Sequence, residues 1–190
     1  MMTDVYFVRH AESDGRVHDD MSRPLTAKGL KDRSLVSDYL ESKRVSVVVS
    51  SPYKRAYDTV AELASRKGLG ITCIDALRER RIADGWIDDF AAYSKRQWSD
   101  FTFKLPTGES LGEVQTRNIE VLRRLLSFYP GETIVIGTHG TALSTVVNYF
   151  DKTFTYDAFL NIVDRMPWIV HFVFEGDKCV SIDSIDLFQL

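Results

Sequence analysis

The stretch VSVVVSSP, residues 45–52, is the clearest indicator of the fold. Residues 45–49 are nearly all apolar and mostly β-branched, as expected of a strand that is covered on both faces. The Ser-Ser-Pro that follows breaks the strand, and a stretch of helical character continues through Lys67. Residues 45–67 therefore predict a strand, a short loop and a helix.

The same alternation extends outward along the chain. Further strands are expected over residues 4–8, 71–74 and 133–136, and further helices over residues 30–40, 111–128 and 142–150, the first of them capped by Thr26. Near the end, residues 168–174 and 178–182 flank Gly176-Asp177 and predict an antiparallel hairpin. The pattern indicates an α/β fold, a three-layer α/β/α sandwich whose sheet is largely parallel and ends in this hairpin.

Composition limits the class of protein. The 190 residues are 44% hydrophobic and 27% charged with a net charge of −3, which predicts one domain over residues 1–190. No basic stripe, targeting segment or long apolar run is present, so we expect a cytoplasmic protein with no nucleic-acid or membrane partner. Cys73 and Cys179 lie in apolar runs without ligand-like spacing, and both are expected to be reduced core residues.

Charged and titratable side chains follow the predicted strands at the same end. Arg9-His10, Arg55, Arg78-Glu79 and Thr138-His139 each lie just beyond the carboxyl end of a strand. Ligands bind at this edge of open α/β sheets. The sequence thus predicts a rim with two histidines, several arginines and one glutamate.

Such a rim suits a phosphate. Arginine presents a rigid fork to phosphate oxygens, and Arg9 and Arg55 are the expected clamps. A neutral histidine can attack phosphorus and form a covalent intermediate, while the second histidine donates a hydrogen bond to the charged oxygens. A carboxylic acid must protonate the leaving group, and Glu79 is the best-placed candidate.

The motifs resemble those of the histidine phosphatase superfamily, also called phosphoglycerate mutase-like. Arg9-His10 matches the start of its Arg-His-Gly signature, and further matches follow in the family's order over about three quarters of the chain, at residues 24–29, 50–59, 77–79, 108–110 and 138–140. The resemblance implies that His10 is phosphorylated and that Glu79 donates the proton. It also implies that Arg9, Arg55 and His139, with Ser13 and Gly140, bind a small phosphorylated substrate without metal or cofactor; a phosphoprotein substrate stays open.

The sequence also departs from the family pattern, and only the departures from the mutase branch favour hydrolysis over transfer. Ala11 replaces the glycine of the signature, a mild change because alanine is the next smallest residue. The motifs typical of the mutase branch are missing at residues 12–16 and 80–83, and the chain is shorter than typical mutases. The resemblance therefore implies a phosphatase, with mutase-type phosphoryl transfer as the alternative.

Three other functions are less well supported by the sequence than a phosphatase. Gly108-Glu109-Ser110-Leu111-Gly112 matches the nucleophile elbow of esterases, but Pro106 stands where that elbow needs a buried strand, so Ser110 or Thr107 is expected to cap a helix. His10, Glu12, Glu79 and His139 could in principle bind a metal, although Arg9 and Arg55 would repel a cation. A silent phospho-ligand binding module is the third alternative. The roles of His18, Arg80, Arg81 and the aromatic segment from Trp86 to Phe103 are left open, as is the oligomeric state.

Overall fold

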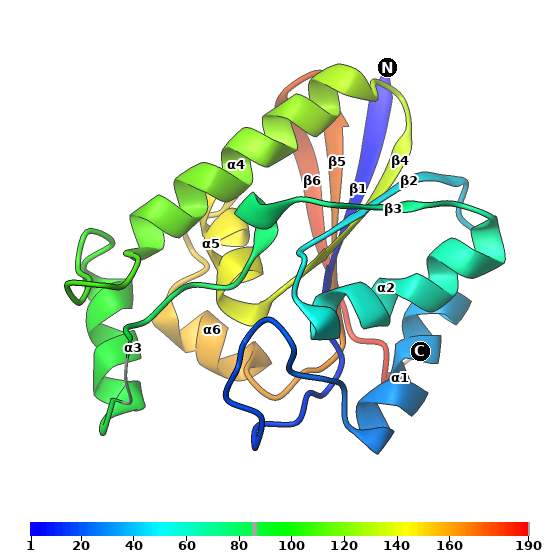
Figure 1. Cartoon of the computed structure of the whole chain (residues 1–190). Helices are drawn as coiled ribbons and strands as arrows, with labels where there is room; N and C mark the ends of the chain where they lie inside the picture. Colours follow the sequence, from blue (N-terminus) through cyan, green and yellow to red (C-terminus); the bar gives the residue numbers. More distant parts are fainter. Residues whose placement is uncertain (85–86, 190) are drawn as a thin grey trace.

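The computed structural model describes residues 1–84 and 87–189, and within them one mixed sheet forms the centre of the molecule (Figure 1). Its six strands have the order β3-β2-β4-β1-β5-β6. They are β1 (Met2–Arg9), β2 (Val45–Ser50), β3 (Ile71–Cys73), β4 (Thr133–Thr138), β5 (Trp168–Glu175) and β6 (Lys178–Ile185). The first four strands in this order are parallel, and β5 and β6 are antiparallel to their neighbours. The predicted α/β sheet with its C-terminal hairpin is confirmed.

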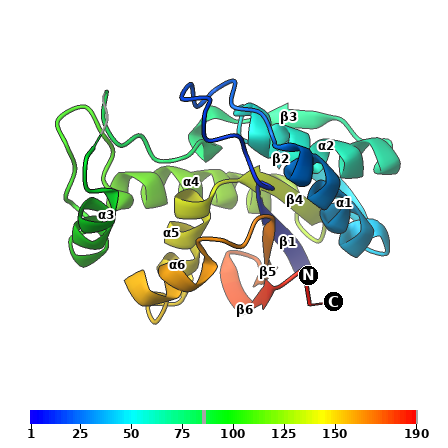
Figure 2. The same cartoon turned by 90° about the horizontal axis from the view of Figure 1, so that it is seen from below.

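Helices cover both faces of the sheet (Figure 2). One face carries α1 (Ala27–Glu41) and α2 (Lys54–Lys67), and the other carries α4 (Leu111–Phe128), α5 (Gly140–Phe150) and α6 (Tyr156–Ile162). A short 3₁₀ helix (Asp75–Leu77) follows β3, and α3 (Phe90–Ser99) contacts α6. The result is the three-layer arrangement that the sequence predicted.

The side chains of β1 alternate between two buried clusters. Tyr6 and Val8 pack with α1 and α2, whereas Val5 and Phe7 pack with α4 and α5. This period of two is what a strand covered on both faces requires. The alternation fixes the register of β1, and therefore the position of Arg9 and His10 at its end.

The caps of two helices agree with the sequence. The Thr26 hydroxyl accepts a hydrogen bond from the Gly29 amide, and Ser110 forms a capping box with Glu113 at the start of α4. Ser110 is thus a helix cap, the role preferred above to that of an esterase nucleophile. The helix expected from Ala142 begins at Gly140 instead, because His139 is its extended N-cap residue.

Three features differ from the sequence expectation. Cys73 is exposed and not a core residue, because β3 is a three-residue strand at the edge of the sheet. The middle of the aromatic segment forms α3, which was not predicted. This helix buries Tyr93 and Trp98 but leaves Phe90 exposed, and Trp86 lies outside the described residues. Helix α6 was also missed. Among the described residues, no helix has the length and apolar character to cross a membrane.

Candidate active site

The two histidines lie side by side because their strands are parallel neighbours. Arg9, the last residue of β1, is in register with Thr138, the last residue of β4. The His10 amide donates to the Thr138 carbonyl at 3.1 Å, and the His10 and His139 rings lie 5.4 Å apart. The carboxyl edge of the sheet thus brings together residues that are far apart in the sequence.

The hydrogen bonds of His10 define its tautomer. Its Nδ1 lies 2.7 Å from the Ala11 carbonyl oxygen, which can only accept, so Nδ1 carries the hydrogen. Its Nε2 then has a free electron pair, to which Arg55 Nε donates at 3.2 Å. Burial, followed by the charges of Arg55 and Arg9, lowers the pKa of His10 well below its usual value. His10 is therefore a neutral imidazole whose unprotonated Nε2 accepts from Arg55.

Arg55 is held at the start of α2 with its charge directed at the site. Its Nη1 donates to the Asp20 carbonyl at 2.7 Å and its Nη2 to the Asp20 carboxylate at 3.2 Å. Its guanidinium lies 5.1 Å from the centre of the Tyr53 ring, a cation–π contact. An anion entering the site would compete with Asp20 for these N–H groups.

Arg9 has a different arrangement from the fork that the sequence predicted. Its Nη1 donates to the carbonyls of Ile162 and Arg165, and its Nη2 donates to that of Val163, all at the end of α6. Its Nε is buried without an acceptor. Both terminal nitrogens are engaged, so Arg9 offers Nε to an anion and does not offer a two-pronged clamp.

Gly140 leaves room for that guanidinium. A Cβ atom at position 140 would lie 3.0 Å from Arg9 Nε, 3.1 Å from its Cζ and 3.2 Å from its Nη2. A side chain here would crowd the Arg9 guanidinium and force it to shift slightly. Burial lowers the pKa of Arg9 to about 10, which leaves it charged near neutral pH.

His139 is oriented by Ser51, a residue that the sequence reasoning did not single out. His139 Nε2 lies 2.8 Å from Ser51 Oγ, and that oxygen already accepts from the Tyr53 amide at 3.2 Å. The hydroxyl can donate to Nε2, and we assign the imidazole hydrogen to Nδ1 on this arrangement. Nδ1 is buried without a partner, and burial lowers the pKa of His139 well below its usual value. A neutral ring with an unused N–H donor results.

Glu79 reaches the same edge through the first turn of α5. Its Oε2 accepts from the Thr141 amide at 2.9 Å, and its Oε1 accepts from the amides of Ala142 at 3.1 Å and Arg80 at 2.7 Å. The start of a helix favours a carboxylate at this position. Because His139 is the N-cap of α5, these bonds hold Glu79 next to the histidine pair.

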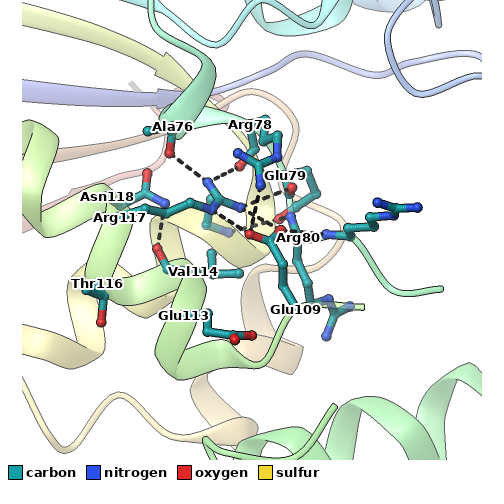
Figure 3. Close-up of polar contacts among 12 residues, drawn as sticks. Ala76, Arg78, Glu79, Arg80, Glu109, Glu113, Val114, Thr116, Arg117 and Asn118 are labelled. Atoms are coloured by element: carbon teal, nitrogen blue, oxygen red, sulfur yellow. Dashed lines mark hydrogen bonds and ion pairs between the residues drawn. The ribbon is translucent and has the colours of Figure 1, made fainter. Parts of the chain in front are cut away.

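Arg117 and Glu109 hold the segment that carries Glu79 (Figure 3). From α4, Arg117 donates to the carbonyls of Ala76, Arg78 and Glu79 at 2.7, 2.8 and 3.2 Å. The same guanidinium donates to the Glu109 carboxylate at 2.9 and 3.1 Å. The backbone before Glu79 is therefore fixed by a single arginine side chain.

The remaining predicted residues lie in the loop after β1. Ser13 forms an isolated antiparallel bridge with Leu25, and the Glu12 carboxylate accepts from the Thr26 hydroxyl at 2.7 Å. Glu12 thus has a structural partner in the N-cap residue of α1. In the described part of the chain, no group of three or more histidine, cysteine, aspartate and glutamate side chains is arranged to hold a metal ion.

Sequence reasoning missed several residues around the site. Ser51 belongs to a motif that matched the family, and its place at the end of β2 was a usable signal. Tyr53 belongs to the same motif, so the sequence offered the same indication for it. Asp20 lies in a polar loop, where nothing in the sequence distinguishes it from a solvated carboxylate. Arg117 lies within a long amphipathic helix, and its role depends on a contact with a segment about forty residues away.

Known proteins share both the sequence pattern and the fold. Phosphoserine phosphatase 1 of Hydrogenobacter thermophilus is 28% identical over 155 residues, which cover 73% of this chain and 71% of that protein. A protein of Salmonella arizonae named Probable phosphoglycerate mutase GpmB is 29% identical over 160 residues, 77% of this chain and 74% of that protein.

Solved structures match almost the whole chain. A mycobacterial glucosyl-3-phosphoglycerate phosphatase has a TM-score of 0.76 at 18% identity, with 97% of each chain covered. A phosphoserine phosphatase of Entamoeba histolytica, solved with phosphoserine, has a TM-score of 0.76 at 20% identity and covers 97% of this chain and 96% of its own. At these identities the likeness concerns the fold.

The family itself follows from a broader match. The model of the histidine phosphatase superfamily, branch 1, matches residues 5–181, which include every residue of the site described above. The protein therefore belongs to the histidine phosphatase superfamily.

Proposed function

We propose that this protein hydrolyses a small phosphate monoester through a phosphohistidine formed on His10. The observation that supports this most is the state of His10: a buried neutral imidazole whose Nδ1 hydrogen is fixed by the Ala11 carbonyl and whose Nε2 faces Arg55. A nucleophile needs a free electron pair next to positive charge that can receive a phosphoryl group.

The reaction proceeds in two displacements. His10 Nε2 attacks phosphorus, the bond to the leaving oxygen breaks, and that oxygen takes a proton from Glu79, which must therefore be protonated when the substrate is bound. A water molecule then gives a proton to the Glu79 carboxylate and attacks phosphorus, the N–P bond breaks, and inorganic phosphate leaves. Arg55, Arg9 Nε and His139 Nδ1–H supply positive charge and donors for the phosphoryl oxygens in both steps.

Transfer of the phosphoryl group back to the product is the second candidate, because several relatives carry the name of a probable phosphoglycerate mutase. The missing mutase motifs at residues 12–16 and 80–83 support hydrolysis. A phosphate-release assay and a 3- to 2-phosphoglycerate interconversion assay on the same preparation separate the two. We expect phosphate release to exceed interconversion and to fall about a thousandfold or more in His10→Ala. Faster interconversion would favour the mutase, and full activity of His10→Ala would refute the proposal.

A further inference from the structure

A cavity of about 310 Å³ lies beside the candidate active site. Its walls include Tyr53 and Asp20, the two residues that also contact Arg55. The Tyr53 ring lies 5.2 Å from the His139 ring as well. A group bound in this cavity would therefore be next to a phosphoryl group held at Arg55 and the histidines.

Arg80 lines this cavity and is 4% exposed. Its guanidinium carbon lies 5.6 Å from the centre of the Phe90 ring and 5.4 Å from that of Tyr93, both on α3. Its Nη1 donates to the Gln97 side-chain oxygen. The Gln97 amide nitrogen is itself fixed by the carbonyls of Phe103 and Glu109, at 3.0 and 2.9 Å. The guanidinium is thus held rigidly by α3.

The guanidinium of Arg80 forms no ion pair with a carboxylate in the described residues, and the charge of Glu79 acts on it only from a distance. No carboxylate lies within ion-pairing distance of its guanidinium there, and its Nε is buried without an acceptor. The other charged residues of the cavity are paired: Asp20 with Arg55 and Arg23, and Arg81 with Asp84. A buried, unpaired cation is costly, so such a group normally meets an anion in the functional state.

We infer that Arg80 binds a carboxylate on the leaving group of the substrate, so that the preferred substrates are phosphorylated carboxylic acids. This inference rests on the proposed phosphatase function. With Nη1 on Gln97, the Nε and Nη2 edge remains as a fork that matches the two oxygens of a planar carboxylate. One guanidinium neutralises one carboxylate, whereas a second phosphate would bring about two charges close to Asp20. The apolar wall residues Ile82, Ile87 and Phe90 suit the carbon skeleton.

Two substrate pairs that differ at the carboxylate test this directly. They are phosphoserine against phosphoethanolamine, and 3-phosphoglycerate against glycerol 3-phosphate. We expect the wild-type kcat/KM to favour the acid by about ten- to a hundredfold in both pairs, the size of a charged hydrogen bond. In Arg80→Met this ratio falls to about one, mainly through KM, because the contact is made before and during the reaction.

The controls locate the effect. Arg96→Met on α3, whose guanidinium lies over the Phe103 ring and does not line the cavity, keeps the wild-type ratio. Arg80→Lys keeps the charge but loses the fork, and it gives an intermediate ratio even if Arg80→Met does not fold. Fructose 1,6-bisphosphate against fructose 6-phosphate tests a second phosphate, and we expect a smaller preference there than for the carboxylate pairs.

The outcomes separate this inference from the proposed function. A wild-type ratio near one, an unchanged ratio in Arg80→Met, or a loss of preference in Arg81→Met alone would overturn the role of Arg80 while hydrolysis stands. A stronger preference for the bisphosphate would overturn the carboxylate. Failure to hydrolyse any of these monoesters would refute the proposed phosphatase, and the substrate class with it.

Discussion

The Nε atom of Arg55 lies 3.2 Å from Nε2 of His10, so a permanent cation is hydrogen-bonded to the nitrogen that would attack phosphorus. The contact is possible only while that nitrogen is unprotonated. Together with burial, it keeps His10 neutral in the folded protein, and it places the phosphate-binding charge next to the nucleophile before any substrate arrives.

The low pKa of His10 has a consequence for stability. In the unfolded chain a histidine titrates near pH 6.5, whereas in the folded protein the pKa of His10 lies well below that value. The contribution of neutral His10 to the free energy of unfolding is therefore fully present above about pH 6.5. It is lost as the pH falls toward the pKa of His10 in the folded protein. We expect the free energy of unfolding of His10→Gln to decline less steeply than that of the wild type below pH 6.5, by about 1.4 kcal/mol per pH unit. Denaturant titrations between pH 6.5 and 5 measure both slopes, and equal slopes would contradict the neutral state of His10.

Glu79→Gln separates proton donation from phosphate capture. We expect kcat/KM for an alkyl ester such as glycerol 3-phosphate to fall by about a hundred- to ten-thousandfold, because its leaving oxygen needs a proton. With 4-nitrophenyl phosphate, whose leaving group departs as an anion, the loss is about tenfold or less. Steady-state kinetics measure both losses, and the aryl ester serves as the control for the alkyl ester. Equal losses of kcat/KM on the two esters would show that Glu79 is not the acid.

Ser51→Ala tests the tautomer of His139. Without the hydroxyl, nothing donates to His139 Nε2, and the hydrogen is free to move there from Nδ1. We expect kcat to fall about ten- to a hundredfold, since one hydrogen-bond donor to the phosphoryl group is lost. Nitrogen NMR of the imidazole should show the hydrogen on Nδ1 in the wild type. Ser51→Thr, which keeps the hydroxyl, should retain the wild-type tautomer; an Nε2-protonated wild-type ring would refute the assignment.

Substitution of Arg117 is expected to reduce stability and activity together. In Arg117→Met the carbonyls of Ala76, Arg78 and Glu79 lose their donor and the Glu109 carboxylate loses a partner. We expect the free energy of unfolding to fall by about 2 kcal/mol, because a partly buried ion pair and the donor to three carbonyls are lost, and kcat to fall because Glu79 is less well held. Arg124→Met, at an exposed position of the same helix, should stay within about 0.5 kcal/mol of the wild type in chemical denaturation. A similarly small change in Arg117→Met would show that the segment from Ala76 to Glu79 keeps its conformation without Arg117.

The strands and long helices could be predicted from the sequence because their patterns are local. The Val-rich run of β2, the spacing along α4 and the Thr26 cap each depend on residues within a few positions. Helix α6 is seven residues long, too short for its spacing to stand out, and α3 is defined by contacts of Trp98 with other elements. These contacts arise only in the folded chain.

The candidate site likewise has residues that could be predicted from the sequence and features that could not. Arg9, His10 and His139 could be proposed because a parallel sheet brings the ends of its strands together. The direction of each side chain could not be predicted. Arg9, for example, donates to carbonyls at the end of α6, which the sequence did not predict as a helix. The burial of Arg80 likewise depends on α3. Its lack of an ion pair among the described residues cannot be read from a sequence.

Detection of a phosphorylated His10 during turnover tests the central claim most directly. Protein mixed rapidly with a ³²P-labelled monoester and quenched in alkali should carry a label that is stable in base and lost in acid. Peptide mapping should locate that label on His10, and His10→Gln should carry none. Turnover without any label on His10 in the wild type, or with undiminished rate in His10→Gln, would contradict the mechanism.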